Sequence, residues 1–467
     1  MLSKTVNRNK VFILNKSELE GKFEVSYYIP KIKNLEDKIR EKTSKKLSDY
    51  ILKLSSGATP SVTEIEKFYS DKENGIPFLR VQNLQPNGKL NIDEVKYINK
   101  ETHENYLKRS QVSEGDLLIK ITGVGRMAVA SVAPIGFIGN TNQHMVVIKT
   151  ESRAVSEYLA NYLNLDLVEK LATRRATGGT RPALDYHALK SIPIIENIDF
   201  SILEKAEVLK RKKEIQATEL LTSIDIYLLK ELGIVLPEKN NSLQSRIFTT
   251  QFSELSGIRF DPDYISKYKF LVNQKAKYEF LPLGDLIKQS PQYGANEEAL
   301  EKTSERDIRY IRITDIDEIG NLKAKSWKTA LNTDDRYLLN YNDLLFARSG
   351  SVGKCYIHKE IDKDAIFAGY LIRFVLDTNK ANPDYIFYFC NSSIYKFWVS
   401  AIERPAVQSN INSEEFKSMP IPLPPLEKQI EIAKNIRNIR AQAKKLQEEG
   451  KAILEKAKQE IEKIILQ

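Results

Sequence analysis

The chain contains an internal repeat, and a duplicated unit restricts the possible folds more than any other feature of this sequence. Five segments of the first half match five segments of the second half in the same order, at spacings of 227 to 237 residues. The pairs are 22–28 with 259–264, 76–81 with 308–313, 115–119 with 342–346, 122–126 with 349–354, and 189–194 with 416–421. This series predicts two domains of one fold, each with strands that enter glycine-containing turns.

Each half ends in a long helical stretch, at residues 201–232 and 426–466. In the second stretch, small and apolar residues recur alternately every four and three positions, the heptad pattern of a helix that packs along a partner helix. The predicted seam positions are Ile432, Ile436, Ile439, Ala443, Leu446, Ile453 and Ala457 in this stretch, and Ile202, Ala206, Leu209, Leu220 and Ile224 in the first. Gly450 also lies on the seam and weakens the helix locally.

At 1.5 Å per residue, either helix is roughly 50 Å long. We therefore predict an α+β protein in which two duplicated mixed α/β domains are joined by long antiparallel coiled-coil helices. The 467 residues suffice for two such domains and their connecting helices. The expected parts are an N-terminal extension at 1–21, a first domain at 22–200, a central helix at 201–240, a second domain at 241–425 and a C-terminal helix at 426–467.

The composition favours a polyanionic partner. Lysine and arginine number 71 against 62 acidic residues, which leaves a formal charge of +9. Cys355 and Cys390 lack the paired spacing of zinc ligands or of a redox motif, and no run of about 18 apolar residues occurs. We expect a cytoplasmic protein that has no metal site, no export signal and no membrane span.

Three segments carry a resemblance to a known family. They are residues 56–61 (SGATPS), 115–118 (GDLL) and 420–429 (PIPLPPLEKQ), the last of which leads into the C-terminal helix. With these segments the chain resembles the specificity subunits of type I restriction-modification enzymes. Two places depart from the resemblance: residues 195–200 replace the proline-rich run of the second half, and residues 286–294 (LIKQSPQYG) replace the first half's glycine-threonine-proline loop. Contacts made by these loops are therefore expected to differ between the halves.

The resemblance implies a division of labour among subunits. Each globular half would be a target recognition domain that reads one part of a split site in double-stranded DNA. The helices would hold the domains apart and dock two methyltransferase subunits, through which the nuclease-translocase (restriction) subunits join. This chain would perform no catalysis, and S-adenosylmethionine, ATP and Mg²⁺ would bind to the partner subunits. The half-sites are expected about one duplex turn apart, the separation at which two readers face the same side of B-DNA.

A reader of duplex DNA needs cations and amides for phosphates, and forked or amide side chains for base edges. The expected contacts in the first half are Thr59, Arg80, Gln82, Asn83, Thr122, Arg126, Arg174, Arg175, Thr180 and Arg181. Those in the second half are Arg312, Thr314, Arg348, Ser349, Lys354, Arg404, Gln408 and Asn410. The foremost candidate is the arginine-rich stretch 174–181, which surrounds a glycine pair; for any single residue, a solvated surface role is the alternative.

Two other functions are alternatives to this one. A nuclease or methyltransferase would need a metal cluster, a cofactor-binding glycine strand or an acidic proline-proline motif, whereas the four histidines are dispersed and the only proline pair precedes a helix. The loop 349–354 also lacks the spacing of a nucleotide-binding P-loop. A protein adaptor, whose helices recruit partners, is the second alternative, and salt-dependent DNA binding separates it from a recognition subunit.

Overall fold

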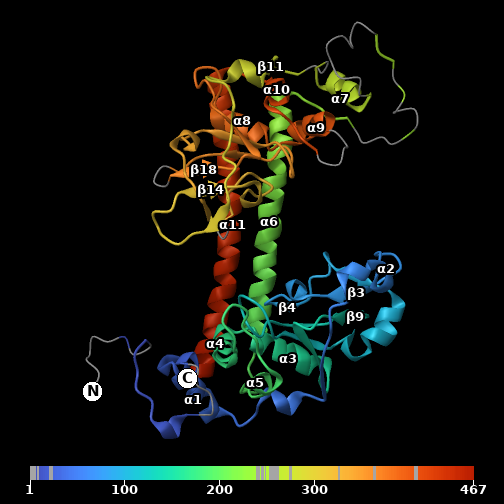
Figure 1. Ribbon diagram of the computed structural model, residues 1–467, viewed down its shortest axis with the longest axis vertical. Coiled ribbons are helices and arrows are strands. Elements are labelled where there is room, and N and C mark those ends of the chain that lie inside the picture. The colour runs from blue at the N-terminus through green and yellow to red at the C-terminus, as the bar shows by residue number, and fades with distance from the viewer. Residues whose placement is uncertain are drawn as a thin grey trace. The chain divides into compact units, whose positions relative to one another are not determined.

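The chain forms two compact units in a computed structural model, which describes residues 7, 10–19, 25–237, 242, 247, 249–251, 262–272, 276–323, 327–360, 364–403 and 409–467. Unit 1 comprises Met1–Lys213 together with Glu448–Gln467, and unit 2 comprises Glu214–Gln447. Each unit combines helices and sheets (Figure 1), so the predicted α+β class is confirmed. None of the helices in the described part of the chain is long and apolar enough to span a membrane.

Unit 1 contains two five-stranded sheets. The first has the order β1-β10-β7-β8-β4, formed by Lys53–Ser56, Met145–Lys149, Leu117–Lys120, Ala130–Val132 and Gly88–Lys89. The second has the order β2-β5-β3-β9-β6, formed by Tyr69–Ser70, Lys96–Ile98, Ile76–Leu79, Ile138–Thr141 and Gln111–Ser113. Strand β7 is buried along its whole length, which explains why Leu117–Ile119 form a continuous apolar run and not an alternating one.

The helices of unit 1 are α1 (Pro30–Lys42), α2 (Ile65–Phe68), α3 (Arg153–Leu163), α4 (Asp166–Arg175) and α5 (Tyr186–Lys190). The side chains of Ser152 and Asp185 accept hydrogen bonds from the first turns of α3 and α5, the usual N-cap role of these residue types. The apolar face of α3 packs with the central strands in one core that also receives Ala457, Ile461 and Ile465 from the end of the chain.

Unit 2 contains the four-stranded sheet β12-β19-β16-β17, formed by Gln292–Tyr293, Leu371–Phe374, Leu344–Ala347 and Cys355–Ile357. Three two-stranded sheets pair β11 (Phe280–Pro282) with β20 (Pro420–Pro422), β13 (Ala299–Glu301) with β15 (Lys328–Ala330), and β14 (Arg309–Ile311) with β18 (Ala365–Phe367). Its helices are α7 (Pro262–Val272), α8 (Pro383–Phe389), α9 (Ser393–Ile402) and α10 (Ser413–Lys417). Aromatic side chains such as Phe346, Trp398 and Phe416 fill the core.

The two units repeat one fold. The order β1-β10-β7-β8 in unit 1 recurs as β12-β19-β16-β17 in unit 2, with antiparallel neighbours throughout. A parallel pair also recurs, as β3 with β9 and as β14 with β18. After β3 and β14 the chain makes the same short 3-10 turn, in which the amide of Arg80 or Arg312 donates to the side chain three residues on. The internal repeat read from the sequence is therefore a repeat of structure.

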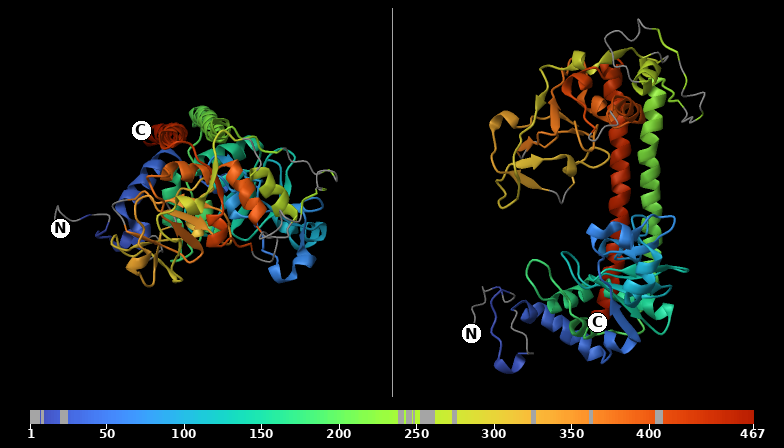
Figure 2. Two further views of the ribbon diagram at one scale, coloured as in Figure 1. Left: turned by 90° about the horizontal axis from the view of Figure 1, so that it is seen from above. Right: turned by 45° about the vertical axis from the view of Figure 1, so that its right-hand side comes forward.

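Two long helices, α6 (Ser201–Leu232) and α11 (Leu426–Leu466), occupy the predicted ranges. In unit 1, Lys213 of α6 pairs with Glu449 of α11 at 2.5 Å. In unit 2, the Tyr227 hydroxyl accepts a hydrogen bond from Asn435 at 2.9 Å, and Glu231 pairs with Lys428. Residue numbers thus rise along α6 as they fall along α11, so the two helices lie side by side and antiparallel (Figure 2).

The buried seam of α11 contains Ile432, Ile436, Ala443 and Ala457. One predicted position of α6 was wrong, because Leu209 is 50% exposed. Lys210 lies against α11 instead, opposite Gly450: a Cβ on Gly450 would make ordinary van der Waals contact with the Lys210 carbonyl oxygen, at 3.4 Å.

Candidate nucleic-acid interface

In each unit the same two loop segments are tied together at the end of the central sheet. In unit 1, Thr122 bridges to Ala183, and the Leu184 amide donates to the Ile121 carbonyl at 2.8 Å. In unit 2, Ser349 bridges to Asn410, and the Ile411 amide donates to the Arg348 carbonyl at 2.8 Å. The glycine loop that follows β7 or β16 is therefore held against the segment that precedes α5 or α10.

A third segment packs against the end of β9 or β18 through a glycine that admits no substitute. A Cβ on Gly57 would lie 1.6 Å from the Thr141 carbonyl oxygen, and a Cβ on Gly294 would lie 2.4 Å from the Phe367 carbonyl oxygen. Gly294 therefore occupies in unit 2 the place of Gly57 in unit 1, although the sequences around them differ. The residue that follows each glycine by two, Thr59 or Asn296, is exposed.

A hydroxyl pair fastens this third segment to the short helix, and the two units build it in opposite ways. In unit 1 the Tyr186 hydroxyl donates to Ser56 Oγ at 2.6 Å. In unit 2 the tyrosine comes from the other side, and the Tyr293 hydroxyl donates to Ser413 Oγ at 3.2 Å. The frame is thus retained while the aromatic ring changes position.

We call these tied segments the loop cluster of each unit. The loop cluster of unit 1 comprises residues 56–59, 121–126, 142–144 and 177–186, and that of unit 2 comprises residues 293–296, 348–354, 369–370 and 410–413. Both clusters lie at the ends of strands, so the sheets hold their side chains in place.

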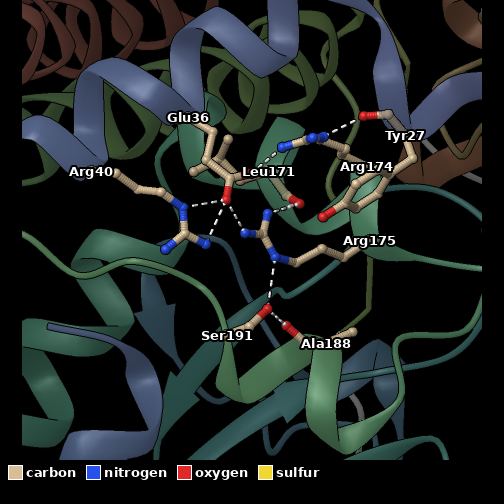
Figure 3. A network of polar contacts seen from close by, with 8 residues as sticks. All are labelled: Tyr27, Glu36, Arg40, Leu171, Arg174, Arg175, Ala188 and Ser191. Carbon is tan, nitrogen blue, oxygen red and sulfur yellow. Dashed lines mark hydrogen bonds and ion pairs between the residues drawn. The ribbon is translucent and has the colours of Figure 1, made fainter. Parts of the chain in front are cut away.

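The structure corrects the foremost sequence candidate. Arg174 and Arg175 do not lie in a surface loop, because α4 continues to Arg175, and the two side chains are only 4% and 2% exposed. Their guanidinium groups point toward α1 and bind the Glu36 carboxylate (Figure 3). Arg174 also donates to the Tyr27 carbonyl and stacks on the Tyr27 ring, with 4.0 Å between guanidinium carbon and ring centroid.

This ion cluster stabilises unit 1 and leaves neither arginine for DNA. Arg175 also donates hydrogen bonds to Ser191 Oγ at 3.0 Å and to the Leu171 carbonyl at 2.9 Å. Burial alone would raise the pKa of Glu36, but the charges of the neighbouring arginines, with a hydrogen bond from Arg175, outweigh burial and hold the pKa below its ordinary value. Unit 2 fills the equivalent end of α9 with buried Ala401 and Ile402 instead.

Several other predicted contacts are already engaged within their own unit. Arg126 pairs with Asp166, Lys354 with Glu318 and Arg312 with Asp315, so their charges are compensated. Asn83 is buried and donates to the carbonyls of Asn91 and Glu94, and Ser349 is buried in the bridge to Asn410. Residue type alone could not reveal these partners. Most of them lie outside the sequence segment of the residue that they bind, and Asp315 lies in the same short turn as Arg312.

Other predicted side chains remain available at the surface. In the loop clusters, Thr59, Thr180, Arg181 and Asn410 are exposed, whereas Thr122 and Arg348 are partly exposed. Outside the loop clusters, Gln82 and Thr314 are exposed on the turns that follow β3 and β14, beside the partly buried Arg80. Arg404 and Gln408 lie outside the described residues.

Three tyrosines of the loop clusters were not among the predicted contacts. Tyr186 is 41% exposed, Tyr293 is 38% exposed and Tyr370 is 61% exposed. An exposed aromatic ring can contact bases or sugars and can hold an arginine by stacking. Aligning Gly57 with Gly294 would have placed Tyr293 in the second loop cluster. The sequences around the two glycines differ, so the sequence alone did not suggest this alignment.

Comparison with known proteins identifies the class of this fold. Residues 275–456 match the model of the type I restriction modification DNA specificity domain. The StySPI type I restriction enzyme specificity subunit of Salmonella potsdam is 26% identical over 144 residues, which are 29% of this chain and 31% of that protein. The expected resemblance to type I specificity subunits is thereby confirmed, and residues 275–456 carry the match to the specificity domain.

Two solved structures are similar over most of the chain. One describes complex assembly and conformational transition of the type I R-M system; it has 13% identity, covers 90% of this chain and 95% of that chain, and has a TM-score of 0.45. The other is the S subunit of the type I restriction-modification system from M. genitalium, with 12% identity, the same coverage and a TM-score of 0.37.

Proposed function

We propose that this chain is the DNA sequence-recognition subunit of a type I restriction-modification complex, and that the loop cluster of each unit reads one part of a split DNA site. The observation that carries the proposal is the specificity domain at residues 275–456, whose loop frame recurs in unit 1. Reading two different half-sites requires one scaffold with different side chains at its loops.

The loop clusters meet this requirement residue by residue. Equivalent positions carry Ser56 and Tyr293, Thr59 and Asn296, or Ile121 and Arg348, and at the last pair the backbone hydrogen bonds are the same in both units. Side chains of these types contact phosphates and base edges, and the net charge of +9 favours duplex DNA. The proposed chemistry of this subunit is recognition, with methylation and ATP-driven cleavage on partner chains.

The long helices offer surfaces for those partners. Val208 and Leu209 of unit 1 are 69% and 50% exposed on α6, and Ile215, Ile226 and Ile430 of unit 2 are exposed on α6 and α11. Apolar side chains on the outside of helices suit association with other subunits. We assign this surface to the two methyltransferase subunits, through which the restriction subunits would join.

The decisive experiment maps adenine methylation across the genome of cells that express this chain with its methyltransferase, compared with cells that lack only this chain. A split motif that depends on the chain is expected. In parallel, the purified complex should shift duplex DNA with an affinity that falls as salt rises, because phosphate contacts release counterions. An unchanged methylome together with salt-independent or absent DNA binding would favour the protein adaptor.

Arg181 tests the assignment of the loop cluster in unit 1. Arg181→Ala should weaken binding through one half-site only. Arg153→Ala in the same unit is the matched control, because Arg153 lies outside the loop cluster and pairs with Glu157 on α3. Equal losses at both half-sites would show that the loop cluster is not where unit 1 meets DNA.

A further inference from the structure

Arg348 differs from the predicted contacts Arg126, Lys354 and Arg312, because it is held in place without being neutralised. Its guanidinium carbon lies 4.9 Å from the centroid of the Tyr293 ring, and its Nε donates to Asn410 Oδ1 at 3.3 Å. No described carboxylate pairs with it, whereas Arg126, Lys354 and Arg312 each have one. Its two terminal nitrogens have no hydrogen-bond partner among the described residues.

The backbone of Arg348 is fixed on both sides. Its amide donates to the Tyr370 carbonyl at 3.0 Å, and its carbonyl accepts from the Ile411 amide at 2.8 Å. Unit 1 makes the same two bonds at Ile121, with His144 and Leu184 as partners. The position is therefore equivalent in the two units, but in unit 1 it holds a buried isoleucine.

This difference between Arg348 and Ile121 separates contacts to bases from contacts to the DNA backbone. The sugar-phosphate backbone is alike in both half-sites, so two duplicated domains can contact it with the same residues at the same positions. Base sequence differs between half-sites, and it must be read where the domains differ. Arg348 and the ring beneath it occur together in unit 2, whereas unit 1 has isoleucine at the first position and Ser56 at the second.

We propose that Arg348 reads a guanine in the half-site bound by unit 2, with Tyr293 and Asn410 as positioning residues. A guanidinium whose Nε is occupied still presents two parallel N–H donors, which match the O6 and N7 acceptors of guanine in the major groove. Stacking on Tyr293 removes freedom from the side chain before DNA binds, so less is lost on contact. The inference rests on the proposed function and names the base chemistry of one of its two sites.

The test uses the complex with its methyltransferase and the motif found by methylation mapping. Duplexes carry 7-deazaguanine, which lacks the N7 acceptor, at each guanine of one half-site in turn. We expect one position where this change weakens wild-type binding roughly 5- to 150-fold, and where the Arg348→Ala complex shows no further loss. Arg348→Lys keeps the charge and should lose discrimination at that base while the salt dependence of binding stays unchanged.

Arg336→Lys is the matched control, since Arg336 also lies over a tyrosine ring, at 4.6 Å, but is exposed and paired with Asp334 outside the loop cluster. Circular dichroism and thermal unfolding of each variant check that unit 2 is folded. Three outcomes would overturn the proposal: a unit 2 half-site without guanine, sensitivity to 7-deazaguanine that persists in Arg348→Ala, or equal weakening on all DNA sequences with a smaller salt slope, which marks a phosphate contact. A wild-type complex that methylates no split motif would refute the proposed function itself.

Discussion

Glu36 accepts hydrogen bonds from three arginine side chains, Arg40, Arg174 and Arg175, and is itself almost fully buried. Removing one partner from a buried ion cluster leaves uncompensated charge, which costs far more than the net contribution of the intact cluster. We expect Glu36→Gln to lower the free energy of unfolding of unit 1 by about 3–5 kcal/mol at neutral pH. The exposed pair of Glu64 with Lys67 is the control, and Glu64→Gln should cost less than about 1 kcal/mol.

The effect of Glu36 depends on pH in a defined direction. Because its pKa is lowered in the folded chain, its contribution is present above its ordinary pKa of about 4.3 and is lost as pH falls through the lowered value. The difference in stability between wild type and Glu36→Gln should therefore shrink as pH falls below about 4. Hydrogen exchange of unit 1 amides in denaturant at several pH values measures this; a difference that grows at low pH would contradict it.

Gly450 and Gly233 are two glycines of the long helices with opposite requirements. Gly450 is inside α11, where a Cβ would make ordinary contact with Lys210 at 3.4 Å or more. Gly233 ends α6 with φ +67°, and a Cβ there would lie 3.1 Å from Lys277. Gly450→Ala should thus raise the free energy of unfolding by about 0.5–1 kcal/mol, whereas Gly233→Ala should lower it by at least about 1 kcal/mol. Equal effects in thermal unfolding would refute this account of the helix pair.

The helix pair also predicts how the spacing of the DNA site is set, if the proposed function holds. Residues 215–221 of α6 and 441–447 of α11 lie in matched stretches of the antiparallel register given by Tyr227 with Asn435. Deleting both heptads keeps the seam in phase. We expect methylation mapping to show a shorter spacer between two unchanged half-sites. An unchanged spacer would show that the length of the helices does not set the spacer length.

Much of this architecture could be predicted from the sequence, because its signals are periodic or repeated. The heptads located α6 and α11, and the internal matches located corresponding strands in both halves. Individual contacts could not be predicted, since they depend on residues distant in sequence. Glu36 lies 138 positions before Arg174, and nothing near that arginine signals that α1 buries it. The exposed Leu209 was missed because the seam shifts opposite Gly450, on another helix.

At the scale of the whole molecule, unit 1 is built from two separate parts of the chain. The last turns of α11 bring Ala457, Ile461 and Ile465 into its core, and the Glu462 carboxylate accepts a hydrogen bond from the Leu167 amide at 2.7 Å. That carboxylate caps the start of α4, where no side chain of the preceding residue does so. In the sequence, all of unit 2 comes between these two parts.

A truncation after Gln447 should therefore damage the unit that is remote in sequence. We expect amides of unit 1 to exchange faster in the truncated chain, while unit 2 keeps its protection. Both tryptophans, Trp327 and Trp398, belong to unit 2, so tryptophan fluorescence reports on that unit alone and should retain its unfolding midpoint in urea. A loss confined to unit 2 would show that the end of α11 does not support unit 1.

The same discontinuity sets the order of events during synthesis. The ribosome makes the first part of unit 1, then all of unit 2, and only then the segment that completes unit 1. At roughly 5–20 residues per second this interval lasts on the order of tens of seconds. During that time the core that contains Leu203 and Ala206 lacks Ala457, Ile461 and Ile465 of α11. The unit that emerges first is therefore the unit that is completed last, because its core is filled only after residues 448–467 have been made.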